Sequence, residues 1–91
     1  MREVEVKYSF DGGLLTARID DKKLAFTGGT ATKMVPEGKQ LTLQWFVRGA
    51  PGARYTIKIT RPPAAKFEYS ATLDADRKDA GLHWFQVGWE A

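Results

Sequence analysis

"QLTLQWFV" (residues 40–47) is the stretch that decides the fold, because its apolar and polar positions alternate along the whole segment. Successive side chains of a β-strand point to opposite faces of the sheet, so strict alternation predicts a strand with one buried face. Phe46 is the one large apolar residue in the opposite phase, and we expect the N-terminal strands to cover it. The predicted core face of this strand consists of Leu41, Leu43, Trp45 and Val47.

The same two-residue period recurs through most of the chain, and no window keeps apolar residues at helical spacing for three turns. Short strands spaced at about ten residues are typical of an all-β sandwich or a small barrel. "DGG" (residues 11–13) predicts a tight hairpin between the first two strands, whereas "TATKMV" (residues 30–35) is too weak a pattern to assign. The other predicted strands are residues 4–10, 14–19, 24–27, 54–60, 66–73 and 82–89.

The length and composition predict one globular domain, residues 1–91, without disulfide bonds. The chain has 91 residues, 27% of them charged, with a net charge of +3 and no cysteine. This charge is too small to indicate nucleic-acid binding. No segment approaches the roughly 18 apolar residues of a membrane span, and the N-terminus has no signal-peptide pattern. We therefore expect a cytoplasmic protein, or a periplasmic or extracellular one from which a signal peptide was removed.

Two segments of the second half carry a resemblance to a known family. "EGKQLTLQWFVRGAPGARYTIKI" (residues 37–59) resembles strands B and C of intermediate-set immunoglobulin domains, and "KDAGLHWFQV" (residues 78–87) resembles their strand F. Trp45 and Phe85 stand where those domains have their two cysteines. The matching residues are Glu37, Gly38, Leu41, Thr42, Leu43, Val47, Gly49 and Pro51 in the first segment, and Asp79, Gly81 and Val87 in the second.

The resemblance implies a two-sheet antiparallel immunoglobulin-like sandwich of about seven strands. It also implies that Trp45 and Phe85 touch across the core, replacing by burial the disulfide that joins the two sheets in such domains. A fibronectin-like or other β-sandwich and a small barrel remain alternatives.

The final predicted strand needs a neighbour, because the strand F motif lies close to Ala91 and leaves no room for a strand G. An exposed strand edge is a template for pairing with another chain. We expect the N-terminal strand, residues 4–10, to fill this vacancy. The alternative is a strand from another protein or from a second copy, so the sequence predicts a monomer or an edge-strand homodimer.

The sequence offers little for catalysis or metal binding. The single histidine, His83, falls in the apolar phase of its strand, which is typical of a structural residue rather than a catalytic base or ligand. Asp74, Asp76 and Asp79 are closely spaced, but they lack the glycine and terminal glutamate of a calcium loop and predict a solvated turn. We therefore expect no enzyme activity, no cofactor and no metal.

One charge pattern stands out, because between Glu37 and Glu68 there are six basic residues and no acidic one. If strands C and F are neighbours, as the resemblance implies, their outward side chains form one surface around Trp84. An exposed tryptophan beside cations could stack on a ligand, or the stems of the cations could cover the indole. The candidate binding residues are Trp84, Arg54, Lys58, Thr56 and Gln86.

These observations favour a non-catalytic module that mediates protein–protein interaction or serves as a structural domain. Immunoglobulin-like folds host many binding functions, so this expectation follows from the resemblance. The alternative is a carbohydrate-binding module in which Trp84 is the stacking platform. The expected partner is accordingly a protein or a glycan, without nucleic acid.

Overall fold

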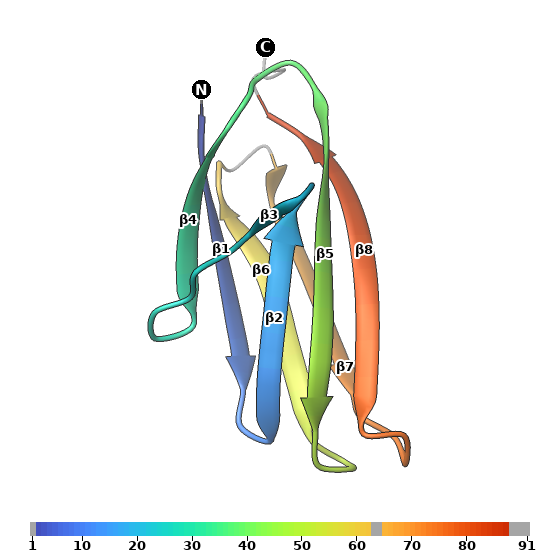
Figure 1. Cartoon of the computed structure of the whole chain (residues 1–91). Coiled ribbons are helices and arrows are strands. Elements are labelled where there is room, and N and C mark those ends of the chain that lie inside the picture. The colour runs from blue at the N-terminus through green and yellow to red at the C-terminus, as the bar shows by residue number, and fades with distance from the viewer. Residues whose placement is uncertain (1, 63–64, 88–91) are drawn as a thin grey trace.

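The computed structural model describes residues 2–62 and 65–87 and consists of two antiparallel four-stranded sheets packed as a sandwich (Figure 1). The all-β prediction is confirmed, with eight strands rather than about seven. The predicted positions Pro63, Ala64 and Trp89 lie outside the described residues. The strands are β1 (Arg2–Phe10), β2 (Gly13–Ile19), β3 (Lys22–Lys23), β4 (Thr30–Val35), β5 (Gln40–Gly49), β6 (Arg54–Arg61), β7 (Phe67–Thr72) and β8 (Lys78–Gln86).

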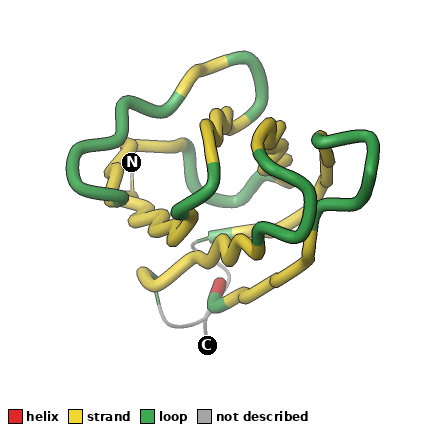
Figure 2. Tube along the Cα trace, turned by 90° about the horizontal axis from the view of Figure 1, so that it is seen from below, coloured by secondary structure: helices red, strands yellow, loops and turns green. Residues whose placement is uncertain are grey.

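The two sheets are built from strands that are mostly not consecutive in the sequence. Sheet A has the order β4-β1-β6-β7 and sheet B the order β3-β2-β5-β8. Figure 2 shows the two layers end on. Every pairing is antiparallel, but β2–β3 and β6–β7 are the only consecutive strands that pair within the described part. The other connections cross from one sheet to the other.

The predicted hairpin at residues 11–13 is wrong, because β1 lies in sheet A and β2 in sheet B. The turn carries the chain between layers, and β2 then pairs with β5, with Gly13 opposite Gly49. A β-carbon at Gly13 would come within 2.0 Å of the carbonyl oxygen of Arg48. Glycine is therefore needed here for the close approach of two backbones rather than for a hairpin turn.

Two strand predictions in the first half also change. Residues 24–27 do not form a strand, because this segment crosses from sheet B to sheet A; Leu24 is buried and Thr27 forms an isolated bridge with Thr30. The unassigned residues 30–35 form β4, an edge strand. Its alternation is weak because Lys33 lies in the same phase as two buried residues, Ala31 and Val35.

The core lies between the sheets and follows the predicted alternation. On β5 the predicted core residues are all at most 2% exposed, and on β6 the same holds for Tyr55, Ile57 and Ile59. Val4 and Val6 of β1 and the inward residues of β2 complete its centre. Period-two patterning therefore identified the buried face of each central strand correctly.

The strand neighbours implied by the immunoglobulin resemblance are wrong. Strands C and F would share a sheet, but β6 pairs with β1 and β7 in sheet A, whereas β8 pairs with β5 in sheet B. Trp45 and Phe85 consequently lie on adjacent strands of one sheet, with Phe85 opposite Leu41 and Trp45 opposite Gly81. They do not face each other across the core.

The N-terminal strand does not cover the last one. β1 lies between β4 and β6 in sheet A, where its buried valines find partners on both sides. β8 is the outermost strand of sheet B, at the right of Figure 1, and β5 is its one hydrogen-bonded neighbour among the described strands.

The described residues form no helix long and apolar enough to cross a bilayer.

Gly81 allows Trp45 to pack flat against β8. A β-carbon built on Gly81 would lie 2.1 Å from the Cζ2 atom of the Trp45 indole. Because cores tolerate added volume poorly, we expect Gly81→Ala to lower the free energy of unfolding by about 1 to 3 kcal/mol, measured by urea denaturation. Ala80→Ser, at the exposed neighbouring position, should change it by less than about 0.5 kcal/mol. Equal effects of the two substitutions would contradict this packing.

Candidate functional site

The structure places the sequence-predicted binding residues on opposite sides of the sandwich. Trp84 and Gln86 project from β8 on the outer face of sheet B, whereas the other three project from β6 on the outer face of sheet A. Packed sheets lie about 10 Å apart, with their outward side chains pointing in opposite directions. The predicted cluster is therefore not formed, and the stems of Arg54 and Lys58 do not cover Trp84.

The outer face of sheet A is mostly polar, and several of its side chains have hydrogen-bonding or ion-pair partners. Thr56 Oγ1 lies 2.8 Å from Ser70 Oγ on the neighbouring strand β7. Lys58 lies opposite Glu68 in the same strand pair, and Arg54 lies opposite Thr72. The three predicted residues of β6 thus belong to a polar face, on which Lys58 has Glu68 of β7 on one side and Lys7 of β1 on the other.

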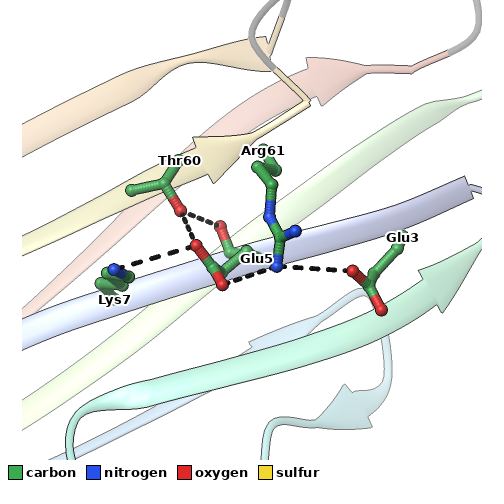
Figure 3. A network of polar contacts seen from close by, with 5 residues as sticks. All are labelled: Glu3, Glu5, Lys7, Thr60 and Arg61. Carbon is green, nitrogen blue, oxygen red and sulfur yellow. Dashed lines mark hydrogen bonds and ion pairs between the residues drawn. The ribbon is translucent and has the colours of Figure 1, made fainter.

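A bulge in β6, where Thr60 is the extra residue, brings polar groups together on this face. The register shifts between Glu5 and Val6, so that Thr60 and Arg61 both reach the carboxylate of Glu5 (Figure 3). The Thr60 hydroxyl donates to Oε1 at 2.6 Å, and Arg61 Nη2 donates to Oε2 at 2.7 Å. The hydrogen bond from Thr60, followed by that from Arg61, holds the pKa of Glu5 below its usual value, although burial opposes this.

The six basic residues between Glu37 and Glu68 therefore do not form one cluster. Arg61 is held by Glu5 and, at 3.5 Å, by Glu3 on β1. Lys39 lies 3.9 Å from the carboxylate of Asp20 near the end of sheet B. The acidic partners, Glu3, Glu5 and Asp20, all lie in the first 20 residues, outside this basic segment.

The outer face of sheet B has the opposite character, because large apolar side chains are exposed there. Leu14 on β2 and Trp84 on β8 are each 64% exposed, while Phe46 on β5 and Leu82 on β8 are each 51% exposed. The expectation that N-terminal strands cover Phe46 is wrong, because β2 lies beside it in the same sheet rather than above it. We call these four residues the apolar stripe.

The strand register makes the apolar stripe continuous. Phe46 lies between Thr16 of β2 and Ala80 of β8, so it is a diagonal neighbour of both Leu14 and Leu82. Diagonal neighbours on one sheet face are within reach of large side chains, and Leu82 and Trp84 follow each other on the same face of β8. The stripe therefore runs obliquely across three strands.

An open depression of about 520 Å³ lies at the Leu14 end of the apolar stripe. Leu14 and Phe46 supply its apolar walls, together with Ala80, and Arg48, Lys78 and Asp79 also line it. Concave apolar surface with a few polar groups at its rim is the usual form of a site that receives a side chain or small group.

The charges around the apolar stripe are positive. The described residues of β2, β3, β5 and β8 place no acidic side chain on this face, because Asp79, the one carboxylate among them, points into the sandwich. The cations on the face are Arg18, Lys23, Arg48 and Lys78. None of them forms an ion pair with a described residue.

Sequence reasoning found Trp84 but missed the rest of this surface. Leu14, Phe46 and Leu82 all occupy the polar phase of their strands, and this was the available signal. A large apolar residue out of phase in one strand is unremarkable, since much of a protein surface is apolar. Three adjacent strands with such a residue form a patch, but their adjacency was not readable from the sequence.

Inside the sandwich, a buried tyrosine joins the two sheets through hydrogen bonds. Tyr55 of sheet A is fully buried, and its hydroxyl accepts from Trp45 Nε1 at 3.0 Å and donates to Asp79 Oδ2 at 2.7 Å. Burial, together with the adjacent carboxylate, raises the pKa of Tyr55, so that the phenol stays protonated and remains a donor. Asp79 therefore does not share a site with Asp74. The carboxylate of Asp74 instead accepts a hydrogen bond from the amide of Asp76 in the turn before β8.

His83 lies on the inner face of β8, at the side of the sandwich where β7 and β8 form the edges. Its ring stacks on Phe67 of β7, with centroids 3.7 Å apart and planes 12° apart, and it lies parallel to the ring of Phe85, with centroids 6.3 Å apart. Desolvation by these neighbours lowers the pKa of His83. The neutral imidazole is therefore part of the packing between the two edge strands.

Comparison with known proteins finds no family model, curated protein or solved structure that matches this chain.

The stacked position of His83 makes the free energy of unfolding depend on pH. A histidine pKa lowered from 6.5 in the folded chain means that the unfolded chain takes up the proton more readily. We expect an NMR titration midpoint for His83 below 6.5. The free energy of unfolding should decrease as the pH falls below 6.5 and level off once the pH is below the folded midpoint. His83→Phe should remove the decrease in this pH range. A midpoint at or above 6.5 would contradict the stacked, desolvated ring.

Proposed function

We propose that this chain is a non-catalytic, immunoglobulin-like sandwich module that binds a partner protein through the outer face of sheet B. The immunoglobulin-like description is supported by the two antiparallel four-stranded sheets with a tryptophan at their centre, although β6 and β8 depart from the pairing of strands C and F. The binding function is supported by one observation above all, the apolar stripe. Its four large apolar side chains are more than half exposed on one continuous sheet face.

The contrast between the two faces supports this choice. Apart from Met34, the outer face of sheet A consists mainly of threonine, serine and charged residues, as a face in permanent contact with water should. Exposed contiguous apolar patches on a soluble domain mark interaction sites, and aromatic residues and arginine dominate the binding energy of protein interfaces. The outer face of sheet B has both kinds of residue.

The charges indicate the chemistry of the partner. Four cations surround the apolar stripe without an acidic residue between them, so a partner with carboxylates around an aliphatic or aromatic anchor is complementary. The depression beside Leu14 and Phe46 offers a place for that anchor. Binding should weaken as salt is added, because the cations are exposed.

Selection from a displayed library of random peptides tests the proposal with a defined probe. Enriched peptides should combine an aromatic or aliphatic anchor with Asp or Glu, and Phe46→Ser and Trp84→Ser should each weaken their binding about tenfold or more. Met34→Ser is the matched control, because Met34 is 49% exposed on the outer face of sheet A. Binders that are insensitive to both sheet B substitutions, or equally sensitive to Met34→Ser, would contradict the proposal.

Carbohydrate binding is a second candidate, supported by the surroundings of Trp84. Its indole is exposed beside Thr42, and the amides of Gln40 and Gln86 share a shallow hollow with it. An exposed aromatic ring with amide groups at its side can stack on a sugar and bond its hydroxyls. Affinity electrophoresis in polysaccharide gels separates the candidates, since retardation by a glycan should be lost in Trp84→Ser but kept in Phe46→Ser.

A further inference from the structure

The free edge of β8 presents a row of backbone donors and acceptors. The amide of Gly49 in β5 donates to the carbonyl of Arg77 at 2.9 Å, so the polar groups of Arg77 face β5. Along a strand these groups face alternate sides. The residues of β8 whose amides and carbonyls point away from β5 are therefore Lys78, Ala80, Leu82, Trp84 and Gln86.

Over residues 80–86, β8 also lacks the charged side chains that protect the other three sheet edges. β3 consists of Lys22 and Lys23, β4 has Lys33 in its inward phase, and β7 includes Glu68. Lysines, inward-pointing charges and very short edge strands all discourage pairing with another chain. In β8 the charges are confined to Lys78 and Asp79 at its start, and residues 80–86 include neither a charged side chain nor a proline.

We propose that β8 pairs antiparallel with β8 of a second copy of this chain, about a two-fold axis at Leu82. Leu82 is the midpoint of β8, so this register aligns the whole strand with its copy. It pairs the residues whose hydrogen-bonding groups face the free edge, and each such pair exchanges two hydrogen bonds. The two B sheets become one continuous eight-stranded sheet.

Side-chain sizes and charges fit this register. On the outer face Leu82 meets its own copy, and the large indole of Trp84 lies opposite the small Ala80 of the second copy. Cross-strand pairs of this kind have β-carbons about 4.5 to 5.5 Å apart, close enough for direct packing. Lys78 lies opposite Gln86, so no two like charges meet.

The inner face is equally compatible. Gly81 lies opposite His83 of the second copy, where the absence of a side chain leaves room beside the imidazole. Asp79 lies opposite Phe85, and its carboxylate is already engaged by the Tyr55 hydroxyl at 2.7 Å. Because this carboxylate already accepts a hydrogen bond, the register leaves no charged group of the inner face without a polar partner, which would otherwise oppose association.

Such a dimer carries two apolar stripes on the same side of one sheet. A partner with two anchors would then gain from simultaneous binding to both copies. The dimer and the protein-binding proposal can be tested separately, because dimerisation is measured by mass and partner binding by the peptide assay.

Charge substitutions at Leu82 test the two-fold axis directly. Leu82 is 51% exposed, so polar substitution there leaves the core intact. The wild-type chain should sediment at micromolar concentration with twice its mass of 10.2 kDa. Leu82→Lys and Leu82→Glu should each sediment as a monomer, because two like charges face each other across the axis, and an equimolar mixture should regain the double mass.

The mixture distinguishes this register from a loss of folding, since unfolded or misfolded variants cannot complement each other. Circular dichroism and thermal unfolding of each variant should match the wild type. A wild-type monomer, dimeric single variants, or a mixture that stays monomeric would each overturn the proposal.

Discussion

The hydroxyl of Tyr55 is the contact on which the arrangement of the two sheets depends. A phenol at full burial needs partners for its polar group, and here both come from the opposite sheet, Trp45 on β5 and Asp79 on β8. Three strands are thereby fixed relative to one another, close to the end of the sandwich at which β6 and β8 begin. Gly81 completes the arrangement, because the indole of Trp45 occupies the space that a side chain there would need.

The position of β8 determines the chemistry of the surface. With Asp79, His83 and Phe85 on the inner side, the alternate residues Leu82 and Trp84 must point outward. They join Phe46 of β5 in the apolar stripe, and the free edge of the strand carries the unprotected backbone groups. The proposed binding face and the proposed dimer edge thus both follow from the orientation of one strand.

Some features of this structure could be predicted from the sequence, and others could not. The alternation of residues 40–47 predicted the buried face of β5 correctly, because side-chain direction along a strand is a local property. The neighbours of β6 and β8 were predicted wrongly, since pairing depends on contacts distant in sequence, and the motif match placed β8 beside the wrong strand. Trp84 was recognised as exposed from its phase, whereas Leu14 and Leu82 became part of a site only when β2, β5 and β8 were seen side by side.

A double-mutant cycle on Tyr55→Phe and Asp79→Ala, followed by urea denaturation, tests most directly whether this hydroxyl ties β6 to β8. If the Tyr55 hydroxyl donates to the carboxylate, the two substitutions should share a coupling free energy of about 1 to 3 kcal/mol. The double variant would then be less destabilised than the sum of the single ones. Effects that add to within about 0.5 kcal/mol would contradict the account.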